Sequence, residues 1–222
     1  MNKLLILPCT SEKLSGGINI DQINDHFKND NLLKNARILR SNYYLKLLSS
    51  DAIKDLEYFE KDRILQHQSS QKVNNVYFNS CFNNNFFYME AVNRYDGILY
   101  NSLVRNLVFN KTKSGLHVLI ISGLYGLLKF DDHIVDYQLD ITKGGNKSWK
   151  VNQVNSISNA LITYIRNNKI SLSDVTVILS KTYSEPLKEI ITTFKENLWD
   201  KADGYGHNHV PFLIDYLSNT SV

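Results

Sequence analysis

The chain has 222 residues, of which 43% are hydrophobic and 11% aromatic, so it can bury one sizeable core and is not a disordered chain. Its 25 basic and 22 acidic residues give a net charge of +3, which does not by itself indicate a nucleic-acid-binding protein, because such binding requires clustered charge. Cys9 and Cys81 lie far apart and outside any CxxC pattern, which argues against a disulfide framework or a cysteine zinc site and predicts a cytoplasmic protein.

The first half of the chain predicts one buried strand followed by a helical arm. Residues 4–7 form a continuous apolar run, too short for a signal peptide or a membrane span, that is typical of a strand buried on both faces. Apolar residues recur at near-helical spacing from 32 to 59, whereas 61–80 is polar, with 73–78 its only strand-like stretch. Residues 86–93 and 98–109 are expected to be helices. We therefore expect a single domain, 1–222, with a helical arm or insertion at about 20–94.

The second half alternates between strands and helices. We expect a central strand at 116–122, a short strand at 134–139, a buried strand at 175–179, and helices at 151–166, at 185–198 and from about 204 to 217. This alternation predicts an α/β fold with a mostly parallel central sheet flanked by helices. Ligands of such sheets bind beyond the carboxyl ends of the strands, so the loops at 9–13, 122–126 and 180–183 are expected to converge.

Two segments in these loops resemble a known family. The run SGLYGLL at 122–128, followed by DYQL at 136–139, is similar to the signature of the YaaA family, and YDGILYNSL at 95–103 resembles the segment that precedes it. The opening PCTSEK at 8–13 is similar to the Pro-Cys-Ser-x-x-Lys loop of archaeosine synthases, whose relevant domain resembles uracil-DNA glycosylases. Asp136 stands where the family pattern usually has proline.

The resemblance implies a glycosylase-like fold and a protein that acts on a modified or displaced nucleobase in DNA. Cleavage of an N-glycosidic bond requires a carboxylate near the sugar and donors for the departing base. Asp136 and Asp140 are the candidate carboxylates, and Lys13 is a candidate phosphate or base ligand. A solvated acidic turn is the alternative for both aspartates.

The other candidate site residues would line the substrate pocket, and each has a structural alternative. Cys9 is expected to pack rather than react, Tyr125 either stacks on a flipped base or packs in the core, and the 204–209 segment either binds phosphate or is an exposed helix start. We expect neither a metal nor a cofactor. The candidate substrate-binding residues are Cys9, Thr10, Ser11, Tyr100, Asn101, Ser122, Gly123, Tyr125, Tyr137, His207 and His209.

Three functions are therefore carried forward from the sequence. The leading hypothesis is a DNA glycosylase that flips and excises a modified base, with antiviral defence as an extrapolated role. The second is a non-enzymatic DNA-binding stress protein, in which basic residues of the arm such as Lys34, Arg37 and Arg40 would contact DNA. The third is a transferase that modifies a deazaguanine base in tRNA. The oligomeric state is not predicted.

Overall fold

The central sheet is formed by segments that are far apart in the sequence. In this computed structural model the described residues are 2–19, 71–73, 76–78, 81–82, 85–123, 126–135, 137–138, 157–204 and 206–221. The sheet has the order β12-β11-β1-β7-β8. Its strands are β1 (Lys3–Pro8), β7 (Leu116–Ser122), β8 (Gly126–Lys129), β11 (Val175–Val177) and β12 (Glu196–Asn197). The first four strands in this order are parallel to one another, and β8 is antiparallel to β7, which confirms the predicted mostly parallel sheet.

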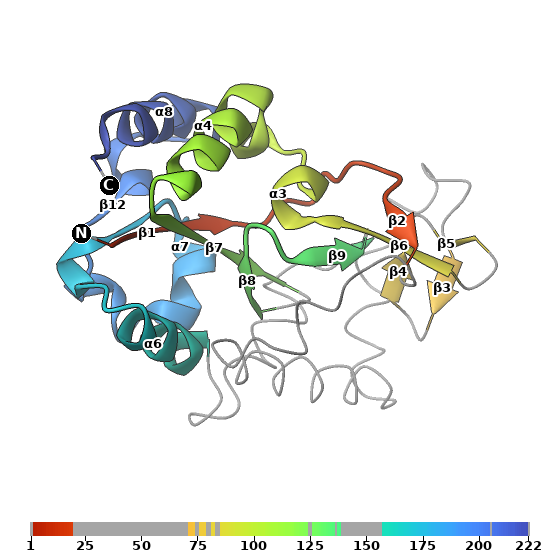
Figure 1. The fold of residues 1–222 in the computed structure, drawn as a ribbon, viewed down its shortest axis with the longest axis horizontal. Coiled ribbons are helices and arrows are strands. Elements are labelled where there is room, and N and C mark those ends of the chain that lie inside the picture. Colours follow the sequence, from red (N-terminus) through yellow and green to blue (C-terminus); the bar gives the residue numbers. More distant parts are fainter. Residues whose placement is uncertain are drawn as a thin grey trace.

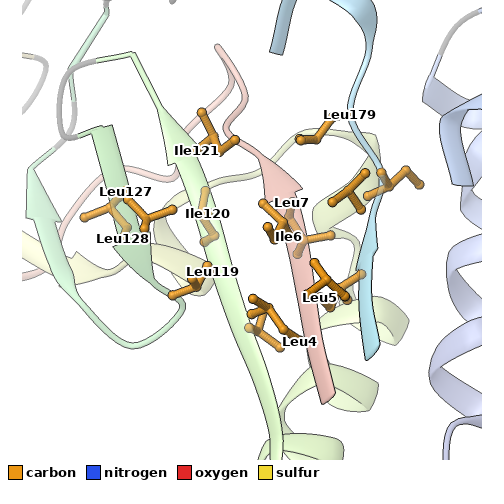
Figure 2. Close-up of a cluster of buried hydrophobic side chains, with 14 of the residues drawn as sticks. Leu4, Leu5, Ile6, Leu7, Leu119, Ile120, Ile121, Leu127, Leu128 and Leu179 are labelled. Carbon is orange, nitrogen blue, oxygen red and sulfur yellow. The ribbon is translucent and has the colours of Figure 1, made fainter. Parts of the chain in front are cut away.

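The two middle strands carry the core (Figure 2). Leu4 to Leu7 of β1 and Leu119 to Ile121 of β7 are at most 1% exposed. Helices α4 (Ser102–Lys113) and α8 (Val210–Asn219) lie on one face of the sheet and α6 (Ile157–Asn167) lies on the other (Figure 1). Strands covered on both faces need apolar residues at successive positions, and each buried leucine or isoleucine contributes about 2 kcal/mol.

Small antiparallel sheets extend beyond this core (Figure 1). In one, β6 (Asn85–Glu90) pairs with β2 (Ile18–Asn19), β5 (Cys81–Phe82) and β9 (His133–Val135). In the other, β4 (Val76–Phe78) pairs with β3 (Gln71–Val73) and β10 (Tyr137–Gln138). The predicted helix at 86–93 was wrong: 85–90 is a strand, as its aromatic residues favour, and only α3 (Ala91–Arg94) is helical.

Two other predicted helices differ from the observed elements. The one at 98–109 is divided into a 3₁₀ turn, η3 (Ile98–Tyr100), and α4, because the Asn101 side chain accepts a hydrogen bond from Val104 N and starts a new helix. The one at 185–198 is replaced by short elements, since Pro186 and the β-branched run at 191–193 disfavour a continuous helix. Those elements are η7 (Glu185–Leu187), η8 (Ile191–Thr193) and β12, and the short helix α7 (Lys181–Ser184) precedes them.

The remaining elements are the 3₁₀ turns η6 (Leu172–Asp174), η9 (Leu198–Lys201) and η10 (Gly206–His209). Most of the predicted helical arm, including its basic residues, lies outside the described residues. Among the helices that are described, none combines the length and the apolar character that crossing a membrane requires.

Candidate functional site

A pocket of about 200 Å³ lies where β1 and β11 end, and we call it the carboxyl-end pocket. It is lined by Pro8, Cys9, Thr10, Gly97, Ile98, Leu99, Tyr100, Ser180, Tyr183, Trp199 and Gly206. Of the three loops expected to converge, those at 9–13 and 180–183 meet in this pocket, whereas no described residue of the 122–126 loop lines it. None of these lining residues carries a formal charge at neutral pH.

Cys9 connects the loops that form the pocket. Its Sγ lies 3.3 Å from the Tyr183 hydroxyl oxygen, and its backbone N donates to Ile121 O at 2.8 Å. The thiol side chain is 7% exposed. Cys9 thus joins the end of β1 to the end of β7 and to α7, consistent with the packing role expected from the sequence.

Tyr100 forms part of the pocket wall and is held by the strand beside it. Its hydroxyl donates to Pro8 O at 2.7 Å, and its ring lies 5.4 Å from that of Tyr95. Burial raises the pKa of the Tyr100 hydroxyl well above its usual value, with further contributions from Tyr95 and Cys9. The hydroxyl therefore stays protonated and acts as a fixed donor to the backbone.

The motifs at 8–13 and 95–103 contact each other. Lys13 and Tyr95 form an antiparallel β-bridge, and Leu14 N donates to Arg94 O at 2.8 Å. The Lys13 Nζ donates to Thr10 O at 2.9 Å and lies 5.5 Å from the centre of the Tyr95 ring. In this arrangement the Lys13 ammonium group closes its own loop beside the pocket.

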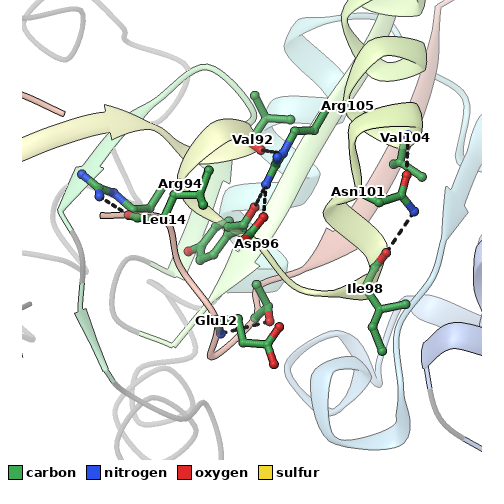
Figure 3. A network of polar contacts seen from close by, with 11 residues as sticks. Glu12, Leu14, Val92, Arg94, Asp96, Ile98, Asn101, Val104 and Arg105 are labelled. Atoms are coloured by element: carbon green, nitrogen blue, oxygen red, sulfur yellow. Dashed lines mark hydrogen bonds and ion pairs between the residues drawn. The ribbon is translucent and has the colours of Figure 1, made fainter. Parts of the chain in front are cut away.

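Two arginines hold the same loops in place (Figure 3). Arg94 is fully buried, and its guanidinium group donates to the backbone oxygens of Leu14 and Gly16. The Arg105 guanidinium group donates to Val92 O at 3.1 Å and also to Tyr95 O and Asp96 Oδ1. Because arginine presents several donors in a rigid plane, each residue holds more than one turn in place.

Gly97 is required by a close approach of two loops. A Cβ added at this position would lie 2.8 Å from the Cβ of Thr10 and closer still to its hydroxyl oxygen. The φ angle of −75° is ordinary, so close packing rather than backbone conformation explains the glycine. Gly97 was not predicted to be a site residue, although the 95–103 segment that resembles the YaaA family contains it.

The other wall of the pocket is built around Trp199, which the sequence reasoning also missed. The Trp199 indole stacks on the His209 imidazole at a centroid distance of 3.9 Å. The His209 Nε2 lies 3.0 Å from Trp199 O and 3.1 Å from Ala202 O. His209 is fully buried, so the interpretation of 204–209 as an exposed helix start was wrong for this residue, although His207 is exposed.

Asn197 supports this wall through the backbone. Its side-chain oxygen accepts from Leu179 N at 3.1 Å and from Trp199 N at 3.2 Å, and its amide donates to Leu179 O at 2.9 Å. The Asn197 amide group thereby bonds to the backbone N–H and C=O of Leu179, as a neighbouring strand would, just beyond the end of β11. It also sets the first turn of η9.

The other predicted site residues are distributed as follows. Ser122 and Gly123 are buried at the end of β7, Ser11 is exposed, and Asn101 caps α4. Asp136, Asp140 and Tyr125 lie outside the described residues, as does the side chain of Tyr137. Their predicted roles therefore stay predictions.

A second hollow of about 200 Å³ lies near the start of β7, and we call it the amino-end hollow. It is lined by Thr112, Gly115, Leu116, His117, Val118, Lys129, Phe130, Asp131 and Tyr164. The His117 Nδ1 lies 2.8 Å from the Tyr164 hydroxyl, and burial lowers the pKa of His117.

The fold and the carboxyl-end pocket define an α/β protein whose candidate site is formed by loops at the ends of parallel strands, with aromatic and hydroxyl groups in its lining. A family model described as peroxide stress protein YaaA matches residues 4–200, so the chain belongs to the YaaA family. The matched range includes β1, the 95–103 segment, α7 and Trp199. Comparisons with curated proteins and with solved structures give no match.

Proposed function

We propose that this chain is a nucleic-acid-binding protein of the peroxide stress response whose carboxyl-end pocket receives one unpaired nucleobase. Membership of the YaaA family supports the stress-response role. The nucleobase is proposed from the lining of the pocket, where Tyr183 and Trp199 lie beside the Cys9 thiol and the Thr10 hydroxyl. Aromatic groups can stack on any base, and small polar groups can bind its edge.

The size and charge of the pocket favour a neutral, flat group of one ring or two fused rings. Its volume of about 200 Å³ lies below the roughly 300–1,000 Å³ of ordinary small-molecule sites. A charged ligand buried there would need a charged partner, and no described lining residue supplies one. A nucleobase is flat, neutral and of single-ring or fused-ring size, and the phosphates of the backbone that carries it would stay outside the pocket.

Binding is preferred to base excision as the primary proposal. Excision requires a carboxylate near the sugar, and the described lining residues include neither aspartate nor glutamate. The glycosylase hypothesis depends on Asp136 and Asp140, and we retain it, together with the glycosylase-like form of the fold, as a hypothesis tested in the same experiment.

The test is a binding titration with the purified protein. We would measure fluorescence anisotropy with labelled duplex DNA containing one unpaired base, with fully paired DNA, with DNA carrying modified cytosines, and with RNA of the same sequence. We expect the unpaired base to strengthen binding and the Tyr183→Ala variant to lose about tenfold in affinity, as for the loss of one base–aromatic stack. Equal affinity for paired and unpaired DNA would contradict the proposal.

A matched pair of variants separates the pocket from the rest of the protein. Tyr183→Phe removes the hydroxyl group beside Cys9, and Tyr164→Phe removes the hydroxyl group beside His117 in the amino-end hollow. We expect only Tyr183→Phe to weaken binding. Mass spectrometry of the same mixtures for released bases, with Asp136→Asn as the control, tests base excision.

A further inference from the structure

Ile98 combines two properties that the other exposed large hydrophobic residues in the described part of the chain do not share. It is 50% exposed, comparable with Leu103 at 51% and above Leu14 and Leu172. Among these four residues only Ile98 lines the carboxyl-end pocket. A single exposed apolar side chain is ordinary on a protein surface, so its place at the rim carries the argument.

The backbone that carries Ile98 is fixed on both sides. Before it, Gly97 packs directly against Thr10. After it, Leu99 and Tyr100 are buried, and the Tyr100 hydroxyl is bonded to Pro8 O. The Asn101 amide donates to Ile98 O at 3.2 Å while its oxygen caps α4 (Figure 3). The half-exposed Ile98 side chain is therefore held on an ordered turn and has little freedom to move into the protein interior.

We propose that Ile98 inserts between base pairs of a duplex and fills the space left by the base that enters the carboxyl-end pocket. Proteins that unstack DNA commonly insert an apolar side chain, including isoleucine, at the unstacked step. An extruded base leaves an apolar gap whose neighbours would otherwise contact water or collapse. This inference rests on the proposed function and adds a preference for double-stranded nucleic acid.

The position of Ile98 would let one residue contact both the base in the pocket and the duplex outside it. Its side chain borders the pocket that receives the base, and its exposed half faces solvent, where the remaining duplex would lie. A fixed turn lowers the entropy lost on insertion, because the rim is already ordered before DNA binds.

The experiment compares duplex and single-stranded DNA of one sequence, each with 2-aminopurine at the target position. For Ile98→Ala we expect about a tenfold loss of affinity for the duplex, which corresponds to one apolar side chain left unburied. Affinity for the single strand should fall less than affinity for the duplex, because a single strand has no gap to fill and loses only the contact of Ile98 with the base in the pocket. Ile98→Leu should restore duplex binding. Leu172→Ala removes a side chain that is 39% exposed just before β11, and should change neither affinity.

The outcomes separate this inference from the proposed function. A clearly larger loss of duplex affinity than of single-strand affinity supports insertion. Equal effects of Ile98→Ala on both substrates, or no effect on either, overturn insertion while the binding proposal stands. Failure of the unmodified protein to bind either DNA overturns both. Thermal unfolding of each variant, expected to match the parent because Ile98 is exposed, shows that the differences arise from binding.

Discussion

The carboxyl-end pocket and the amino-end hollow have the same volume, about 200 Å³, but different linings. The pocket is lined by aromatic, hydroxyl and thiol groups from loops that several buried side chains hold in place. The hollow contains Lys129, Asp131 and the His117–Tyr164 pair, and lies where strand β7 begins. Volume alone therefore does not identify the site. The support of the surrounding backbone and the position at the ends of parallel strands distinguish the pocket.

The largest expected effect tests whether backbone support distinguishes the pocket. Asn197→Ala leaves the buried N–H and C=O groups of Leu179 without their side-chain partner, at about 1–3 kcal/mol for each group. We expect urea unfolding to show a loss of about 2–6 kcal/mol and DNA binding to weaken. The matched control is Asn168→Ala, which removes one hydrogen bond to Tyr164 O near the amino-end hollow. An equal loss from both variants would contradict the comparison.

An intermediate effect is expected from Gly97→Ala. The added methyl group would overlap with Thr10, and overpacking of this kind costs about 1–3 kcal/mol. We expect the urea midpoint to fall and the pocket to lose affinity for an unpaired base. The double variant Gly97→Ala with Thr10→Gly removes the overlapping atoms and should recover most of the lost stability. If it recovers none, close packing against Thr10 is not the reason for the glycine.

The smallest effect concerns His117 in the amino-end hollow. Because its pKa is lowered in the folded state, the unfolded chain binds more protons, so the stabilisation is present above about pH 6.5 and is lost as the pH falls through the folded pKa. Lys129 and Asp131 line the same hollow, but burial of the imidazole is the cause of the lowered pKa. His117→Gln should flatten the dependence of unfolding free energy on pH between 5 and 7 without changing DNA affinity. An unchanged slope in the His117→Gln variant would contradict this origin of the pH dependence.

The sequence predicted the parts of the fold that depend on continuous apolar runs. Residues 4–7 and 116–122 were recognised as buried strands because covering helices require apolar residues on both strand faces. The 86–93 segment was misread because its short apolar run fits a helix or a strand, and its partners β2 and β9 are distant in the sequence. Pairing between distant segments, not local pattern, decides such cases.

The candidate site was predicted in part for the same reason. The loops that follow β1 and β11 were correctly expected to meet, since parallel strands end at one edge of the sheet. No local pattern indicated Trp199, which lines the pocket because Asn197 and His209 hold the 3₁₀ turn that carries it. His209 was predicted to be a substrate-binding residue, but its Nε2 lies within hydrogen-bond distance of two backbone oxygens, a contact that no local pattern reveals.

The order of strands in the sheet has a consequence for synthesis of the protein. Lys3 pairs with Leu116, so β1 waits for a neighbour that the ribosome adds 113 residues later. At about 5–20 residues per second, that interval lasts roughly 5–25 seconds. During this time the apolar run of β1 is available to other nascent chains and to chaperones. Slower initiation or a lower growth temperature should therefore raise the yield of folded protein, because fewer unpaired β1 strands are present together.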